Sequence, residues 1–309
     1  MSAVFFDELG LRAPDHQLGI HSLAHGAMTG RMLEALEGVM LAEKPAMVLV
    51  YGDTNSTLAG ALAAAKLHIP VAHVEAGIRS FNRRMPEELN RVMTDHLSAL
   101  LFAPTHTAVR QLAAEGIARG VHMVGDITYD ATLMVAEKAR ARAGILAEHG
   151  LASRGFSLVT VHRAENTDDS PRFARILGWL EARAAETPLV WPVHPRTRKL
   201  LDARGWAPER ILLLPPLGFL DMAALLQHAA AVFADSGGLQ KEAYFHRIPC
   251  VTLREDTEWP ETIATGWNRL WSGPEHTGPR GEIADFGRGD TAERIAAVLR
   301  ETLSAARSS

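Results

Sequence analysis

The chain has 309 residues, 47% of them hydrophobic and 22% charged, with a formal net charge of −4. This length allows two domains of ordinary size, and the mild acidity gives no basic footprint for a nucleic acid partner. No apolar run reaches the roughly 18 residues of a membrane-spanning helix, and no signal peptide is visible. We therefore expect no membrane partner and a cytoplasmic location. The only cysteine, Cys250, lies in an apolar run and is expected in the core.

Strand-like apolar runs alternate with amphipathic helical stretches through the first half of the chain. A helix is expected over about 27–41, with no strand–helix unit before it. Strands are then predicted over 46–51, 69–74, 99–103 and 121–124, and helices over 56–66, from Pro86, over 105–115 and over 126–147. This alternation is typical of a parallel, doubly wound sheet.

The pattern restarts after a glycine-containing turn that ends at Gly155. Strands are predicted over 156–161, 189–193, 211–214, 231–234 and 250–253, with helices over 170–185, 221–229 and 291–305 among them. The sequence thus predicts an α/β protein of two Rossmann-like, doubly wound domains with a cleft between them. We place the first domain at 1–148 and the second at 149–290.

In the first domain, acidic side chains follow two of the expected strands. Asp53 follows the first strand, and Glu75 and Glu87 belong to the charged stretch 73–91 after the second. Such a stretch is more often a solvated loop with surface ion pairs. However, ligands bind at the carboxyl edge of open α/β sheets, and Gly77 suggests a loop held close to a neighbour.

The second domain offers cations and a glycine turn at its strand ends. Ser236, Gly237 and Gly238 follow a strand and open a helix, where free N–H groups favour phosphate, and Glu242 lies one turn further on for ribose hydroxyls. Further candidates are His162, Arg163, His194, Gly218 and Phe219. Both features also have a purely structural explanation. The turn at Ser236–Gly238 can need glycines for its backbone alone, and His162 can pair with a backbone carbonyl. The histidine spacing predicts no metal site, and neither a Gly-x-Gly-x-x-Gly nor a P-loop pattern occurs. The combination suits a nucleotide diphospho-sugar.

The same motifs resemble those of the non-hydrolysing UDP-N-acetylglucosamine 2-epimerases over essentially the whole chain. The matching segments are 52–57, 73–77, 85–91, 162–167, 192–195, 235–243 and 257–262. The resemblance implies a glycosyltransferase-B-type fold in which the last helix, 291–306, packs back on the first domain. It also implies a homodimer and interconversion of UDP-N-acetylglucosamine and UDP-N-acetylmannosamine without metal, nicotinamide or other cofactor.

The implied reaction explains the residue types. Family enzymes eliminate UDP to give a 2-acetamidoglucal and add it back after C2 is protonated from the other face. By resemblance, Asp53, Glu75 and Glu87 take acid, base and charge-stabilising roles, and which of them removes the C2 proton stays open. His162 is expected beside the diphosphate. Ser236, Gly237, Gly238 and Glu242 would hold UDP, with Arg163 and His194 nearby and Gly218–Phe219 at the uracil.

Two departures from the family leave more than one function open. The family begins with a strand and a Gly-Thr-Arg-Pro-Glu-like loop that this sequence lacks, so the first domain is expected to be N-terminally truncated, without its leading strands. Trp259 stands where many relatives have arginine, a feature shared with a branch acting on UDP-2,3-diacetamido-glucuronic acid. A glycosyltransferase of the same fold, a hydrolysing epimerase and an inactive nucleotide-sugar binder would also fit these residues.

Overall fold

The computed structural model describes residues 6, 8–142 and 144–308, which form two compact units. One, called here the four-stranded unit, holds Pro14–Ala131 and the chain from Ala284 onward. The other, the six-stranded unit, holds Thr132–Ile283 together with the described residues before Pro14. The units therefore divide at 131/132 and 283/284, whereas the sequence placed the boundaries at 148/149 and 290/291. None of the described helices combines the length and apolarity needed to cross a membrane.

The four-stranded unit contains one parallel sheet with the strand order β1-β2-β3-β4. Helix α2 (His25–Glu43) precedes it. The following elements are β1 (Val48–Tyr51), α3 (Asn55–Lys66), β2 (Val71–Val74), α4 (Pro86–Leu97), β3 (Leu100–Ala103), α5 (His106–Ala114), β4 (Val121–Met123), and the start of α6 (Ile127–Arg140). The unit ends with η1 (Ala284–Phe286) and α14 (Thr291–Ser308). Among the described residues, no strand pairs with the outer edge of β1.

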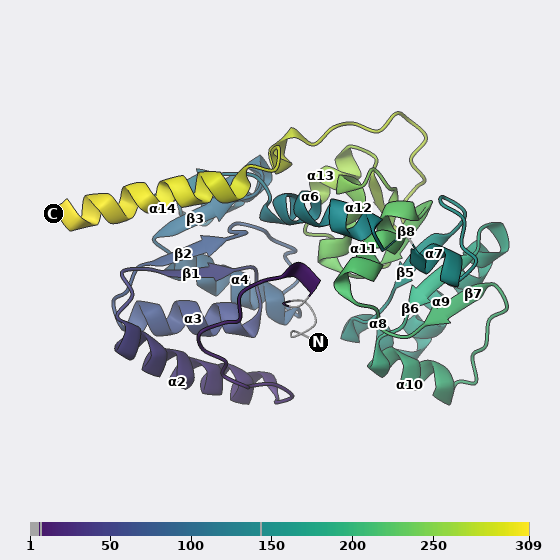
Figure 1. Cartoon of the computed structure of the whole chain (residues 1–309), viewed down its shortest axis with the longest axis horizontal. Helices are drawn as coiled ribbons and strands as arrows, with labels where there is room; N and C mark the ends of the chain where they lie inside the picture. Colours follow the sequence, from purple (N-terminus) through teal and green to yellow (C-terminus); the bar gives the residue numbers. More distant parts are fainter. Residues whose placement is uncertain (1–5, 7, 143, 309) are drawn as a thin grey trace. The chain divides into compact units, whose positions relative to one another are not determined.

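Alternate side chains of this sheet enter different cores. Val71 packs with the alanines of α3 and with Met40 of α2. The next residue along β2, Ala72, packs instead with Phe102 and with Ile295 of α14. Figure 1 shows α3 and the yellow α14 on opposite faces of the sheet. The carboxyl ends of the strands stay uncovered by these helices, which leaves the loops after β1 and β2 to build a site.

The six-stranded unit contains a second parallel sheet, of order β10-β9-β8-β5-β6-β7. Its elements are α7 (Gly144–Glu148), β5 (Ser157–Thr160), α8 (Ala164–Thr167), α9 (Ser170–Glu186), β6 (Leu189–Pro192), α10 (Pro195–Ala203), β7 (Ile211–Leu214), α11 (Phe219–His228), β8 (Ala231–Ala234), α12 (Gly237–Phe245), β9 (Cys250–Thr252), α13 (Pro260–Ala264) and β10 (Asn268–Leu270). The first strand, β5, lies between β6 and β8, so the winding reverses there. Ligands bind at such a switch point in doubly wound sheets.

Helices cover both faces of this sheet, as the sequence predicted. Leu158 packs with α11 and α12 on one face, and its neighbour Val159 packs with α9 and Trp191 on the other. Cys250 is buried in the first of these cores, and burial raises the pKa of its thiol to about 12. The thiol is therefore a core group, as expected from its apolar neighbours.

The structure differs from the sequence prediction at one helix and contains one strand that was not predicted. The helix predicted over 126–147 is two helices, α6 and α7, and Gly144 opens the second; glycine inside a helix costs roughly 1 kcal/mol relative to alanine, so it favours a break. Strand β10 was not predicted because its sequence contains no apolar run. Its first residue, Asn268, is buried and donates to the side-chain oxygen of Gln240 at 3.1 Å, so side-chain hydrogen bonding accompanies the short pairing with β9.

Candidate active site

Asp235, at the end of β8, organises the switch point of the six-stranded sheet. It is fully buried, and its carboxylate accepts hydrogen bonds from the backbone N–H groups of His162 (3.0 Å) and Arg163 (2.9 Å) and from the Asn166 amide (3.1 Å). The His162 ring nitrogen Nδ1 lies 3.2 Å from its Oδ1. The sequence-predicted pair His162 and Arg163 is thus held by a residue that joins β5 to β8.

These contacts set the charge of Asp235. Burial alone would raise the pKa of its carboxyl, but the hydrogen bond and positive charge of His162 and the donors of Arg163 and Asn166 outweigh burial. The pKa is therefore lowered, and Asp235 is a carboxylate at neutral pH.

The turn after Asp235 has the form of a phosphate-binding site. Ser236 caps α12, and its hydroxyl accepts from the N–H of Leu239 at 3.4 Å. A Cβ placed on Gly237 would lie 3.5 Å from the Glu258 carboxylate and 3.7 Å from Nη2 of Arg163, and one on Gly238 would lie 3.5 Å from the Glu242 carboxylate. Glycine therefore leaves room where a helix N-terminus, an arginine and two carboxylates converge, and helix N-termini favour phosphate.

Glu258 is a neighbour of this turn that the sequence analysis did not single out. It is buried, and the fully buried Arg254 donates to both of its oxygens at 3.0 Å. Its position inside the motif 257–262 was the available signal. The adjoining Trp259 is also buried, and the ammonium of Lys241 lies 4.3 Å from its ring centroid. Trp259 is therefore packed against Lys241 in the interior.

His194, Gly218 and Phe219 lie on other strand ends of the same unit. His194 caps α10, where its Nδ1 lies 3.2 Å from the N–H of Arg196. Gly218 precedes α11, and a Cβ there would collide with the carboxylate of Glu8, which accepts from the Leu220 N–H at 3.2 Å. The Glu8 carboxylate is the end of a flexible side chain and can move aside, so this contact does not by itself require glycine.

The four-stranded unit brings together Asp53, Glu75 and Glu87. Burial raises the pKa of Asp53, and the negative charges of Glu75 and Glu87 raise it further, while the charge and hydrogen bond of Arg91 oppose the rise. The chain turns sharply beneath them: Gly52 and Glu75 both have positive φ, at 63° and 71°. A Cβ on Gly52 would lie 3.3 Å from the Glu75 carboxylate, so glycine lets these loops approach.

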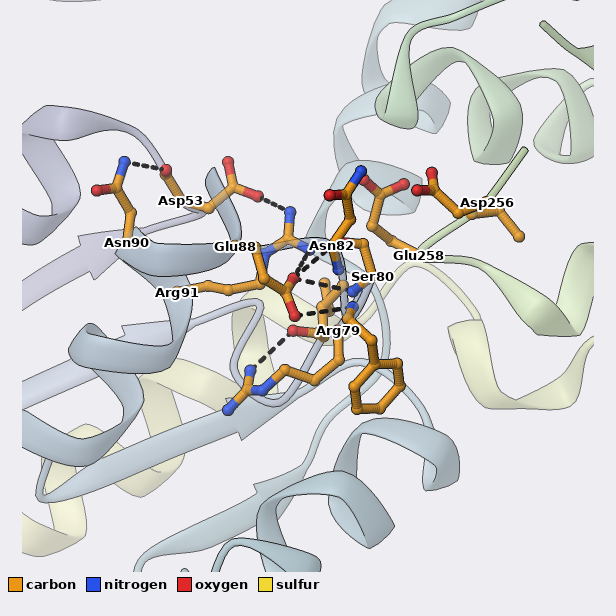
Figure 2. Close-up of polar contacts among 12 residues, drawn as sticks. Asp53, Arg79, Ser80, Asn82, Glu88, Asn90, Arg91, Asp256 and Glu258 are labelled. Carbon is orange, nitrogen blue, oxygen red and sulfur yellow. Dashed lines mark hydrogen bonds and ion pairs between the residues drawn. The ribbon is translucent and has the colours of Figure 1, made fainter. Parts of the chain in front are cut away.

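Residues of helix α4 bind Asp53 and the loop before the helix, as Figure 2 shows. Arg91 hydrogen-bonds the Asp53 carboxylate, and Asn90 donates to the Asp53 carbonyl at 2.9 Å. Arg91 also donates to Glu88 at 3.0 Å, and Glu88 accepts from the N–H groups of Ser80 and Phe81 at 2.9 Å each. Of the two adjacent glutamates, Glu88 therefore ties down the loop, whereas Glu87 interacts with Asp53.

The two groups of residues suit different chemistry. Coupled carboxylates can give and take protons near neutral pH, whereas a glycine turn with arginine and histidine suits a diphosphate. In the described part of the chain, no group of three or more His, Cys, Asp or Glu side chains is arranged to hold a metal ion.

Two parallel-sheet α/β units of this kind define the glycosyltransferase-B type of fold, and solved structures share it. The crystal structure of a Methanocaldococcus jannaschii UDP-GlcNAc 2-epimerase in complex with UDP-GlcNAc and UDP matches with a TM-score of 0.89 at 40% identity, covering 97% of this chain and 88% of that one. A Neisseria meningitidis UDP-GlcNAc 2-epimerase bound to UDP-GlcNAc matches with a TM-score of 0.86 at 26% identity, with the same coverage.

The chain belongs to the UDP-N-acetylglucosamine 2-epimerase family, a family of isomerases, because the family model matches residues 1–300. A curated relative from Pseudomonas aeruginosa, a UDP-2,3-diacetamido-2,3-dideoxy-D-glucuronate 2-epimerase, is 50% identical over 274 residues, covering 87% of this chain and 76% of the relative. The resemblance inferred from the motifs is thereby confirmed.

The contacts of Asp235 generate a first prediction. In Asp235→Asn the new NH₂ group cannot accept from the backbone donors of His162 and Arg163, so we expect a loss of about 2 kcal/mol at pH 7, measured by urea unfolding. Because the folded-state pKa of Asp235 is lowered, its stabilisation is present above the unfolded pKa and is lost as the pH falls through the folded pKa. The difference between wild type and variant should therefore narrow below about pH 4.

The matched control is Asp202→Asn, which removes only the exposed pair with Arg198. It should change the stability by less than about 0.5 kcal/mol. A difference between Asp235→Asn and wild type that does not change with pH would contradict the account of Asp235.

Proposed function

We propose that the chain inverts C2 of UDP-N-acetylglucosamine to give UDP-N-acetylmannosamine, with a 2-acetamidoglucal and free UDP as intermediates. The observation that carries this proposal is the electrostatic coupling of Asp53, Glu75 and Glu87 at one sheet edge. The C2 proton is not next to a carbonyl and is too weakly acidic for direct removal. Carboxylates that act while the C1–O bond breaks avoid that difficulty.

The movements of protons and electrons in this reaction define the roles of these side chains. A carboxylate takes the C2 proton, the C–H electrons form the C1=C2 double bond, and the C1–O electrons leave with UDP. In the return step a carboxyl group protonates C2 on the other face, and a UDP oxygen adds to C1. We assign the donor role to Asp53, because a carboxyl group with a raised pKa keeps its proton closer to neutral pH. Glu75 and Glu87 are the candidate bases.

The uridine diphosphate is assigned to the six-stranded unit. The N-terminus of α12 at Ser236–Gly238 and the side chains of His162 and Arg163 suit the two phosphates, which become more negative as the C1–O bond breaks. Glu242, beside Gly238, suits the ribose hydroxyls. His194 and the Gly218–Phe219 segment remain proposals for diphosphate and uracil, and a cytoplasmic location stays a prediction.

A second substrate is favoured by one comparison. The P. aeruginosa relative named for a diacetamido-glucuronate is 50% identical, whereas the M. jannaschii relative named for UDP-N-acetylglucosamine is 40% identical. UDP-2,3-diacetamido-glucuronic acid carries the same acetamido group at C2, so the same carboxylates could serve it. The ratio of kcat/KM values for the two substrates decides between them.

Incubation with each substrate in deuterated water tests the reaction. We expect the manno epimer with deuterium at C2, detected by proton NMR. Asp53→Asn, Glu75→Gln and Glu87→Gln should each lower kcat about 100-fold or more, while UDP affinity stays within about threefold because UDP is assigned to the other unit. Glu37→Gln, on the exposed side of α2, is the matched control and should leave kcat unchanged.

A different function would give different products. Free N-acetylmannosamine would indicate a hydrolysing epimerase, and transfer to an added acceptor without label at C2 would indicate a glycosyltransferase. Thermal stabilisation by UDP with neither label nor epimer from either substrate would indicate a binder. Each of these results would overturn the proposal.

A further prediction concerns the pH dependence. Arg91 lowers the pKa of Asp53, so Arg91→Met should move the limb of the kcat/KM–pH profile that belongs to Asp53 to higher pH. Arg84→Met, which removes an exposed cation from the same segment, should leave the profile in place. A thermal melt of each variant separates this effect from unfolding, and an unshifted profile in folded Arg91→Met would contradict the assignment of Asp53.

We also propose that the chain forms a homodimer through the outer face of α4 and the loop before it. Phe81, Leu89 and Met93 are 74%, 44% and 46% exposed, and they line a cavity of about 420 Å³. Clustered exposed apolar groups often mark interfaces. Sedimentation should show a dimer that Met93→Asp weakens, whereas Met134→Asp, at a methionine of α6 that is 57% exposed, should leave it intact. A monomeric wild type would contradict this proposal.

A further inference from the structure

His73, on β2, makes contacts that determine its protonation state. Its ring is fully buried. Nε2 lies 2.8 Å from the carbonyl oxygen of Gly52, and Nδ1 lies 2.7 Å from Oδ1 of Asp95. A carbonyl oxygen can only accept, so Nε2 carries a proton. Nδ1 carries one as well if Asp95 is ionised, which makes the ring an imidazolium.

Asp95, on α4, is held in its ionised form. Its second oxygen accepts from Nη1 of Arg79 at 2.7 Å and from the Gly77 N–H at 3.0 Å. Burial raises the pKa of Asp95, but hydrogen bonds and nearby positive charge lower it overall. The Arg79 and Gly77 donors favour the carboxylate whatever the state of the His73 ring. A neutral His73 would turn a bare Nδ1 lone pair toward this carboxylate, which is repulsive at such a distance.

The surrounding charges agree with a cationic ring. Arg79 also makes a two-point pair with Glu115 of α5, at 2.7 and 2.8 Å, and Glu115 in turn contacts His96 of α4 at 3.2 Å. The cluster then holds two buried cations, His73 and Arg79, against the buried Asp95 and the partly exposed Glu115. Buried charges are tolerated when they are paired in this way.

The bond from Nε2 reaches the turn that carries the reacting group. Gly52 precedes Asp53 and has a φ of 63°, so its peptide with Asp53 has an orientation that few residues would adopt. His73 is also two residues before Glu75, at the end of the same strand. One ring therefore links the segments that carry Asp53 and Glu75 to the helix that carries Arg91 and Glu87.

We propose that His73, as an imidazolium clamped between Asp95 and the Gly52 carbonyl, is a positioning residue for the carboxylates Asp53 and Glu75. This role rests on the proposed epimerisation, since those carboxylates are the groups assigned to move protons. His73 does not touch the substrate. The charged groups around it are Asp95 of α4 and Arg79, then Glu115 and His96 beyond Arg79, with Asp53 and Glu75 on the loops that it joins.

The protonation state can be tested without any activity measurement. In protein with ¹⁵N-labelled histidine, long-range ¹H–¹⁵N spectra distinguish a ring with two N–H groups from either neutral tautomer, and the signals missing from His73→Asn identify His73. We expect two protonated nitrogens in the folded protein at pH 7. A neutral tautomer at pH 7 would overturn the proposal.

Two substitutions separate the two bonds of the ring. The amide of asparagine lies where Nδ1 was and can still donate to Asp95, whereas the amide of glutamine lies where Nε2 was and can still donate to Gly52. We expect His73→Asn to lose at least 30-fold in kcat and His73→Gln to retain at least fivefold more activity than His73→Asn. Both should keep UDP affinity within about threefold of wild type. His68→Asn, at an exposed histidine with a φ of 59° that asparagine tolerates, is the control.

The ranking distinguishes positioning from stability alone. If His73 only stabilises the fold, His73→Asn keeps the buried contact with Asp95 and should be the better enzyme and the more heat-resistant protein. That order, or equal activity of the two variants, would overturn the proposal. If the wild type shows no turnover, the epimerase assignment fails, while the NMR measurement still decides the state of His73.

Discussion

Repulsion among the carboxylates at the edge of the four-stranded sheet is the constraint on which the rest of this unit depends. Burial raises the pKa of Asp53, and the negative charges of Glu75 and Glu87 raise it further, because the local dielectric is low. Cations from α4 and the loop before it offset the repulsion. Arg91 pairs with Asp53 directly, and Arg79 with His73 balances the second buried acid, Asp95. The helix that carries Glu87 thus also carries the groups that let it approach Asp53.

The six-stranded unit meets a related problem with backbone donors. Asp235 is buried at the switch point, where N–H groups of the β5–α8 turn satisfy it. These backbone donors come from a turn whose shape they also fix, and the His162 ring adds a hydrogen bond and positive charge. The Asp235 carboxylate thereby fixes where α8 begins, and it places His162 and Arg163 at the end of β5. In this unit a buried acid positions His162 and Arg163, whereas in the other unit Arg91 and Arg79 pair with Asp53 and Asp95.

Much of this arrangement could be predicted from sequence because it depends on short-range pattern. Continuous apolar runs indicated strands that are buried on both faces, and polar residues just after them fell at carboxyl edges as parallel topology requires. The resemblance singled out Glu87, but the contacts of its neighbour Glu88 could not be predicted from sequence. The partners that bury Glu88 are the Ser80 and Phe81 amides of another segment. Likewise, Glu8 lies beside Gly218 although the two are far apart in sequence. No role was predicted for His73, because it is one residue of an apolar strand.

Each unit contains a buried ion pair next to a segment that carries a proposed site residue. His73 and Arg79 flank Asp95 behind the Asp53 turn. Arg254 holds Glu258, whose Oε1 lies 3.9 Å from Nη2 of Arg163 beside the glycine turn. An acid next to a phosphate site would by itself repel the ligand. Arg254, fully buried, offsets that charge, and Glu258 is then able to orient Arg163. Removing one member of such a pair leaves an unpaired buried charge and lowers the free energy of unfolding by about 3–5 kcal/mol. These positions therefore tolerate less change than the exposed side chains that surround them.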